Sequence, residues 1–184
     1  MFYALERLVS EVYPLETLES LIACNRTFVE KIFREQGTFV PMIIGYSKDN
    51  KNRIIIVKGF TDENEKMLLC KIVTMLFSVH DIDKYVFLSE GWAVKSENEQ
   101  PYEKYKSLEN HPNRIEVLSI MAVNKYEAKI ASYEIHADKT LTDFGVPFSA
   151  GGLFTRLLPE KEINERQKKE LRELLERNGI TPNY

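Results

Sequence analysis

Four ionisable residues and one tryptophan lie on two segments of this chain that could form a site. Glu90 and Trp92 belong to a strand-like run, and His111, Arg114 and Glu116 follow a long polar stretch. Carboxylate, imidazole and guanidinium groups transfer protons or hold anions when they lie within hydrogen-bond reach of one another. Structural ion pairs use the same groups, so these residue types do not name a reaction.

Glu90 has two interpretations. Strand alternation places it with Trp92 on one face, and a carboxylate packed among apolar groups there would have a raised pKa. It could then act as a general base or hold an arginine of a partner. The structural alternative makes Glu90 the ion-pair partner of a nearby arginine such as Arg114. We favour the structural alternative, because such pairs also perturb carboxylates.

The segment from His111 to Glu116 also has two interpretations. As a site, His111, Arg114 and Glu116 could join Glu90 in an acid–base or anion-binding group. The structural alternative is a turn followed by a strand, because proline fixes φ and asparagine favours turns. We favour the turn. His136, on a later strand, is expected to be a structural histidine.

The sequence predicts no metal site and no cofactor. The segment His80-Asp81-Ile82-Asp83 carries ligand types, but its spacing matches no zinc or calcium loop, and a helix end with a turn explains it. The chain has no P-loop, GxGxxG, HExxH, GxSxG or CxxC motif. It also lacks the paired histidines of the JAB-type metalloproteases.

The length, composition and net charge of the chain limit the classes of protein to which it can belong. The 184 residues fit a single domain, residues 1–184, and 43% hydrophobic with 29% charged residues is typical of globular proteins. A net charge of −3 without a dense basic stripe argues against nucleic acid as a partner.

The two cysteines and the apolar runs indicate the compartment. Cys24 and Cys70 lie in predicted helices and are expected to be reduced core thiols. No signal peptide and no apolar run of transmembrane length is recognised, so the sequence predicts a cytoplasmic protein.

Periodicity predicts an α+β fold with a mostly antiparallel sheet of about five strands and helices packed on it, in the order α-β-β-α-β-β-β-α. Helical spacing also covers residues 2–12. The expected helices run from Pro14 to Gly37, from Thr61 or Asp62 to Val79, and over 160–178; the expected strands are 39–46, 53–58, 85–94, 114–123 and 128–137.

Two long stretches interrupt these elements, the charged loop 95–113 and the irregular loop 138–158. Long irregular loops in compact domains are often functional. Phe148 and Phe154 in the second loop are candidate binding residues beside Trp92. A weaker alternative is a nucleotide or small-ligand sensor with a pocket formed by these two rings and the backbone near Gly151-Gly152.

Residues 85–137 resemble a loose group of uncharacterised bacterial and phage proteins. In that group a strand with an SE-x-W pattern precedes an HP-x-R-x-E segment, here Ser89-Glu90-Gly91-Trp92 and His111-Pro112-Asn113-Arg114-Ile115-Glu116. The resemblance implies that the two segments meet in space, and it carries no established activity. The order of elements is also similar to that of profilin-like and roadblock-like domains.

These observations predict a small interaction protein, of phage or mobile-element origin, that binds a protein partner or itself through a sheet edge and the long loops. A homodimer is one form of this prediction. The alternative is a hydrolase or nucleotide-processing enzyme that uses Glu90, His111, Arg114 and Glu116, which must then converge in one pocket.

Overall fold

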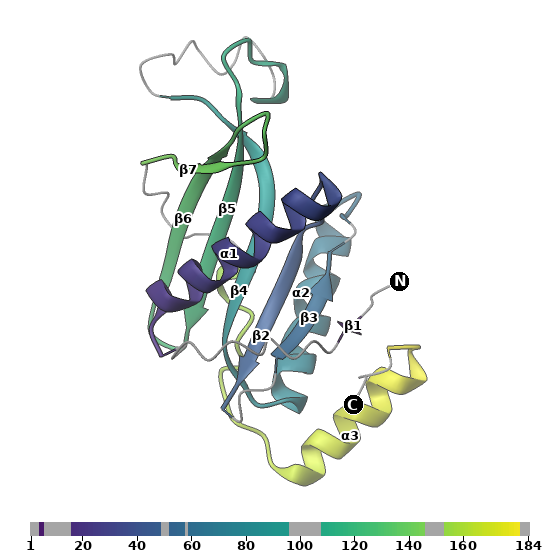
Figure 1. The fold of residues 1–184 in the computed structure, drawn as a ribbon. Coiled ribbons are helices and arrows are strands. Elements are labelled where there is room, and N and C mark those ends of the chain that lie inside the picture. Colours follow the sequence, from purple (N-terminus) through teal and green to yellow (C-terminus); the bar gives the residue numbers. More distant parts are fainter. Residues whose placement is uncertain are drawn as a thin grey trace.

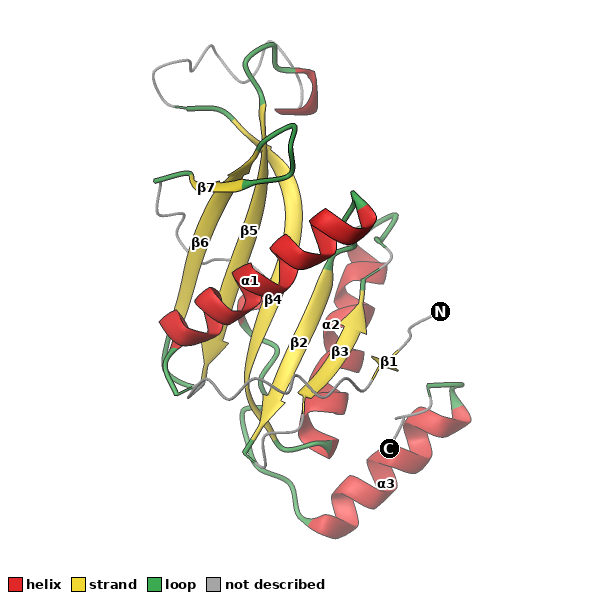
Figure 2. Ribbon diagram, in the orientation of Figure 1, coloured by secondary structure: helices red, strands yellow, loops and turns green. Residues whose placement is uncertain are grey.

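The fold was obtained as a computed structural model. It describes residues 16–48, 52–57, 59–95, 108–145 and 153–180, together with the backbone of Ala4 and Leu5. The predicted α+β class is confirmed: three α-helices pack on an antiparallel sheet (Figure 1; Figure 2).

The sheet has seven strands in the order β1-β3-β2-β4-β5-β6-β7, and every neighbouring pair is antiparallel. The strands are β1 (Ala4–Leu5), β2 (Met42–Ser47), β3 (Asn52–Ile56), β4 (Ile82–Ala93), β5 (Ile115–Asn124), β6 (Ala128–Ile135) and β7 (Leu141–Asp143). The five predicted strands correspond to β2 to β6, and the structure adds two short edge strands.

The helix expected over residues 2–12 is wrong at Ala4–Leu5, which pairs with Ile54 and Ile55 of β3. The rest of that range lies outside the described residues. A strand of two residues could not be predicted from the sequence, because alternation of apolar and polar residues cannot be recognised over so short a stretch.

Pro41 has no N–H to donate within a sheet, so the sequence predicts it at a sheet edge or at the start of a strand. It directly precedes β2, and its carbonyl accepts the Val57 N–H at 2.8 Å. Because β2 lies between β3 and β4, the edge position is wrong and the strand start is confirmed.

Side-chain caps set the beginnings of the helices. Helix α1 (Leu18–Gln36) begins after Thr17, whose hydroxyl accepts the Ser20 N–H, and it ends at Gly37 with a φ of 71°. Helix α2 (Glu63–Val79) begins after Asp62, and α3 (Glu165–Arg177) begins after Asn164. A cap satisfies amide groups that the first turn leaves unpaired, so α1 and α3 begin later than periodicity predicted.

The central strand β4 contributes to the two larger hydrophobic cores, one on each face of the sheet. Its residues Val86 and Leu88 face α1, whereas Tyr85 and Phe87 face α2 on the opposite side of the sheet (Figure 1). This is the alternation that the sequence predicted for residues 85–94.

The apolar residues between Met67 and Val79 leave helix α2 almost no polar face, which predicts a helix buried nearly all round. The structure buries its sheet-facing side but leaves Met67 and Leu68 exposed, at 42% and 57%. The reason is that α3 covers only one flank of α2, by packing Leu171 and Leu175 into the same core.

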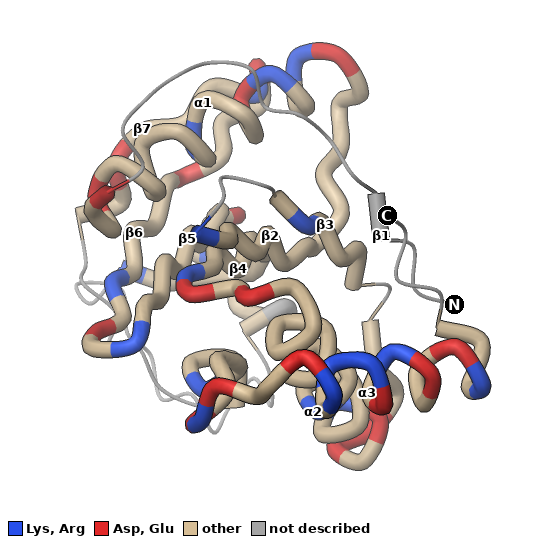
Figure 3. Tube along the Cα trace, turned by 90° about the horizontal axis from the view of Figure 1, so that it is seen from below, with Lys and Arg blue, Asp and Glu red and all other residues tan. Residues whose placement is uncertain are grey.

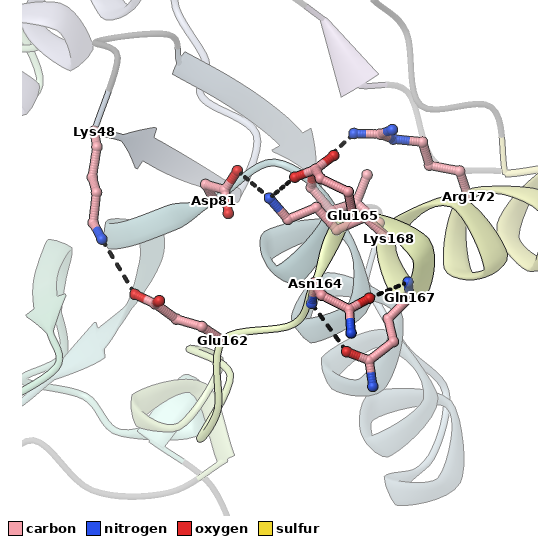
Figure 4. A network of polar contacts seen from close by, with 9 residues as sticks. Lys48, Asp81, Glu162, Asn164, Glu165, Gln167, Lys168 and Arg172 are labelled. Atoms are coloured by element: carbon pink, nitrogen blue, oxygen red, sulfur yellow. Dashed lines mark hydrogen bonds and ion pairs between the residues drawn. The ribbon is translucent and has the colours of Figure 1, made fainter.

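Polar contacts attach α3 to the end of α2 (Figure 4). The Lys168 ammonium donates to Asp81 and to Glu165, each at 2.7 Å, and Arg172 donates to the carbonyl of Val79. Asp81 adopts a left-handed φ of 52° in the turn after α2. The structural interpretation of the His80–Asp83 segment therefore holds for Asp81.

The segment before α3 is fixed to the sheet by Tyr85. Its hydroxyl donates to the carbonyl of Phe154 at 2.5 Å and accepts the Leu157 N–H at 3.4 Å. The Phe154 ring stacks on Phe87 with centroids 4.5 Å apart. Phe154 is thus a packing residue here, while Phe148 and Gly151-Gly152 lie outside the described residues.

Cys24 and Cys70 form no disulfide. Cys70 is buried in the core of α2, where burial raises the pKa of its thiol, whereas Cys24 on α1 is only partly buried.

Gly45 in β2 provides a test of the packing between the sheet and α2. A Cβ atom there would lie 2.9 Å from Cε1 of Phe77 and 3.1 Å from Cγ2 of Ile82. Gly45→Ala is therefore expected to lower the free energy of unfolding by about 1–3 kcal/mol, measured by urea denaturation. Gly91→Ala in β4 is the matched control, because nothing lies within 4 Å of its added Cβ. Equal loss of stability in both variants would contradict the described packing.

Candidate functional site

The pairing of β4 with β5 brings the two predicted site segments together. Trp92 lies directly opposite Glu116, and Glu90 lies opposite Leu118. Residues opposite one another in an antiparallel pair share a face of the sheet, so all four side chains lie on the face that carries α1. The spatial meeting implied by the resemblance is therefore observed.

The character of this face changes along the two strands. Leu88, Leu118 and Ile120 are completely buried in the core under α1. The next residues outward are partly exposed and polar or aromatic. We call this outer region the Trp92 face, and it consists of Glu90, Trp92, Arg114 and Glu116.

Trp92 and Arg114 form a cation–π contact. The guanidinium carbon of Arg114 lies 4.5 Å from the centre of the Trp92 ring, and Trp92 is 38% exposed. A guanidinium over an indole ring is an attractive arrangement at exposed sites. The two side chains therefore hold each other in place at the surface.

The ion pair expected between Glu90 and Arg114 is wrong, since Arg114 lies over Trp92 instead. The register explains the difference. Glu90 is opposite Leu118, four residues along β5 from Arg114, and four residues of strand span about 14 Å. Arg114 is two residues from Glu116, the cross-strand neighbour of Trp92, so the ring is within closer reach.

Glu90 is a half-buried carboxylate with a perturbed pKa. Burial raises the pKa of Glu90 most, and the negative charge of Glu116 raises it further. The Lys139 ammonium and the backbone N–H of Phe39 act in the opposite direction. Glu90 therefore lies where a carboxylate packed among apolar groups was expected to have a raised pKa, and the second carboxylate, Glu116, is an added cause.

Lys139 belongs to this site although the sequence did not indicate it. It lies in the turn between β6 and β7 with a φ of 65°, a left-handed conformation that is uncommon for residues other than glycine. Its N–H donates to the carbonyl of His136 at 2.8 Å, and its ammonium lies 5.7 Å from the centre of the Phe33 ring. The positive charge in this turn thus lowers the pKa of Glu90, against the effects of burial and of Glu116.

His111 is buried within its own turn. Its Nδ1 accepts the Asn113 N–H at 3.1 Å, and its carbonyl accepts the Arg114 N–H at 3.2 Å. The predicted turn through Pro112 and Asn113 is therefore confirmed. Because Nδ1 accepts a backbone hydrogen bond, that nitrogen serves the turn and not proton transfer.

The other predicted histidine has ordinary polar contacts. Nε2 of His136 lies 2.7 Å from the Thr142 hydroxyl, and Nδ1 lies 3.9 Å from a carboxylate oxygen of Glu134. Among the described residues no group of three or more His, Cys, Asp or Glu side chains could hold a metal ion.

The raised pKa of Glu90 predicts a dependence of stability on pH. When the folded-state pKa of an acid is raised, its ionisation destabilises the fold as the pH rises through that pKa. Glu90→Gln removes this destabilisation, so the Tm of the variant should exceed that of the unmodified protein near about pH 8. Near about pH 4 the two Tm values should match, because Glu90 is then protonated in both the folded and the unfolded protein.

Glu116→Gln is the companion variant for this measurement. It removes one cause of the raised pKa of Glu90, so the loss of stability with rising pH should be smaller and should end at a lower pH than in the unmodified protein. A Tm difference for Glu90→Gln that is the same at both ends of the pH range would contradict the described electrostatics.

A family model described as Bacteriophage lambda protein ea47 matches residues 10–148, which include the Trp92 face. Neither the curated proteins nor the solved structures contain a match. The similarity in element order to profilin-like and roadblock-like domains stays a prediction. In the described part of the chain, no helix combines the length and apolar character needed to cross a membrane.

Proposed function

We propose that this chain, which belongs to the family of bacteriophage lambda protein ea47, is a small cytoplasmic interaction protein that binds a protein partner through the Trp92 face. The observation that carries the proposal is the exposed Trp92 ring with the Arg114 guanidinium over it. Tryptophan and arginine are the residue types that most often dominate binding energy at protein interfaces. Their mutual contact reduces the conformational freedom that binding would otherwise remove.

The charges around the Trp92 ring favour a partner that carries both basic and acidic side chains at the contact. Glu90 and Glu116 form no ion pair with another described residue, and neither does Arg114. A basic side chain of a partner would neutralise the two carboxylates, while an acidic one would meet the outer edge of Arg114. Complementary charges of this kind give specificity to an interface.

The sheet edges are less suitable than this face. Both outermost strands are short, and the part of β6 without a described neighbouring strand, Ala128 to Ala131, carries Lys129. Lys129 forms ion pairs with Glu19 and Glu127. A lysine on an open edge opposes the addition of another strand, so the proposal places the contact on the sheet face.

The geometry favours binding over hydrolysis. An acid–base centre made of Glu90, His111, Arg114 and Glu116 needs these side chains within hydrogen-bond reach. The register instead directs Arg114 to Trp92, and Nδ1 of His111 accepts a hydrogen bond within its turn. The described residues also favour a protein over nucleic acid as partner, because Lys and Arg alternate with Asp and Glu along α3 (Figure 3).

Site-specific photocrosslinking in bacterial cells tests the proposal. A benzophenone amino acid replaces Asn113, an exposed residue next to the Trp92 face, whose backbone N–H is retained. We expect a discrete crosslinked product with a protein. Adding Trp92→Ala should reduce its yield about tenfold or more, the effect of losing a dominant interface residue.

Tyr126 is the control position for the crosslinker. It is 90% exposed at the turn between β5 and β6, at the opposite end of β5 from Arg114. The same product from both positions, or a product that Trp92→Ala leaves unchanged, would refute the Trp92 face as the contact surface.

A further inference from the structure

We infer that the partner of the Trp92 face is a second copy of this chain, bound in a symmetric dimer. The inference rests on the proposed function, because it uses the same face and specifies its occupant. It goes further by requiring that this surface be complementary to itself. Mass spectrometry of the crosslinked product distinguishes a second copy from a foreign protein.

A twofold-symmetric contact places one surface patch against the same patch of the partner. Such a patch must therefore carry both members of every complementary pair. The Trp92 face meets this requirement, because it contains the base Arg114 together with the acids Glu90 and Glu116. A patch of one charge would repel itself.

The spacing on β5 suits a twofold rotation. Arg114 and Glu116 are two residues apart, so they are separated by about 7 Å along the strand. A twofold rotation that reverses the direction of β5 exchanges their places. Arg114 of one protomer then lies opposite Glu116 of the other, and symmetry makes this contact twice.

Arg114 is held in a suitable position for this contact. Its guanidinium lies over the Trp92 ring, and its N–H groups remain able to donate to a carboxylate of the second copy. A planar guanidinium can donate two parallel hydrogen bonds to one carboxylate. Glu116 lies directly opposite Trp92, so the acid and the stacked base are adjacent on one surface. Dimerisation would also cover the exposed part of the ring.

Charges on two other surfaces are already paired within the protomer. On α3, Arg166 pairs with Glu170 at 2.9 Å and Arg177 pairs with Glu173 at 3.5 Å. At the β6 edge, Lys129 pairs with Glu19. These surfaces offer a second copy less electrostatic gain than the Trp92 face, where the acids and Arg114 have no described ion-pair partner.

Sedimentation equilibrium with charge-reversed variants tests the inference. Arg114→Glu makes both residues of the pair acidic, and Glu116→Arg makes both basic, so each variant alone should dimerise at least about tenfold more weakly than the unmodified chain. An equimolar mixture of the two variants restores opposite charges at both contacts of a mixed dimer. We expect the mixture to dimerise again.

Arg166→Glu and Glu170→Arg on α3 are the matched control variants, and neither should change the dimerisation constant. Trp92→Ala should weaken dimerisation without reversing a charge, and circular dichroism verifies that each variant is folded. Three results would overturn the inference: an unmodified chain that is monomeric at every concentration, single reversals without effect, or a mixture that stays monomeric. A monomeric chain that still crosslinks to a foreign protein from position 113 would leave the proposed function intact.

Discussion

The register between β4 and β5 determines which side chains pack in the cores on the two faces of the sheet and which form the Trp92 face. Side chains alternate between the two faces of a strand, so a slip of one residue would move every side chain to the other face. In the observed register Val86 and Leu88 pack under α1, and Tyr85 and Phe87 pack under α2. Because both faces of β4 are covered by helices, burial on either side fixes the same pairing.

The Trp92 face is a consequence of that register. Beyond the end of the core under α1, the next side chains on the same face of β4 are Glu90 and Trp92, which lie at the surface. Glu116 of β5 lies opposite Trp92. The partial burial of Glu90 follows from its position beside Leu88 at the margin of the core. Its carboxylate is therefore less well solvated than a surface glutamate, and its ionisation destabilises the fold. Lys139, in a left-handed turn, offsets part of that cost.

Much of this architecture could be predicted from the sequence, because it depends on local patterns. Alternation identified the faces of β4, and the turn signal at Pro112 identified the beginning of β5. The effect of Lys139 on Glu90 could not be predicted, because it depends on where the turn between β6 and β7 lies relative to β4. The stacking of Arg114 on Trp92 could not be predicted either, because it depends on which residues of β4 and β5 are paired. Alternation determines only the face of each residue, so registers that differ by two residues fit the sequence equally well.

Tryptophan fluorescence can show whether a second copy covers the Trp92 face, because Trp92 is the only Trp in the chain and lies at the proposed contact. Emission and quenching by iodide would be measured over a wide range of protein concentration. We expect an accessible, readily quenched ring at low concentration, and a blue-shifted, protected ring at high concentration as the second copy covers it. A ring that is protected even at the lowest concentration, or one whose emission and quenching never change with concentration, would show that the Trp92 face is not a dimer contact.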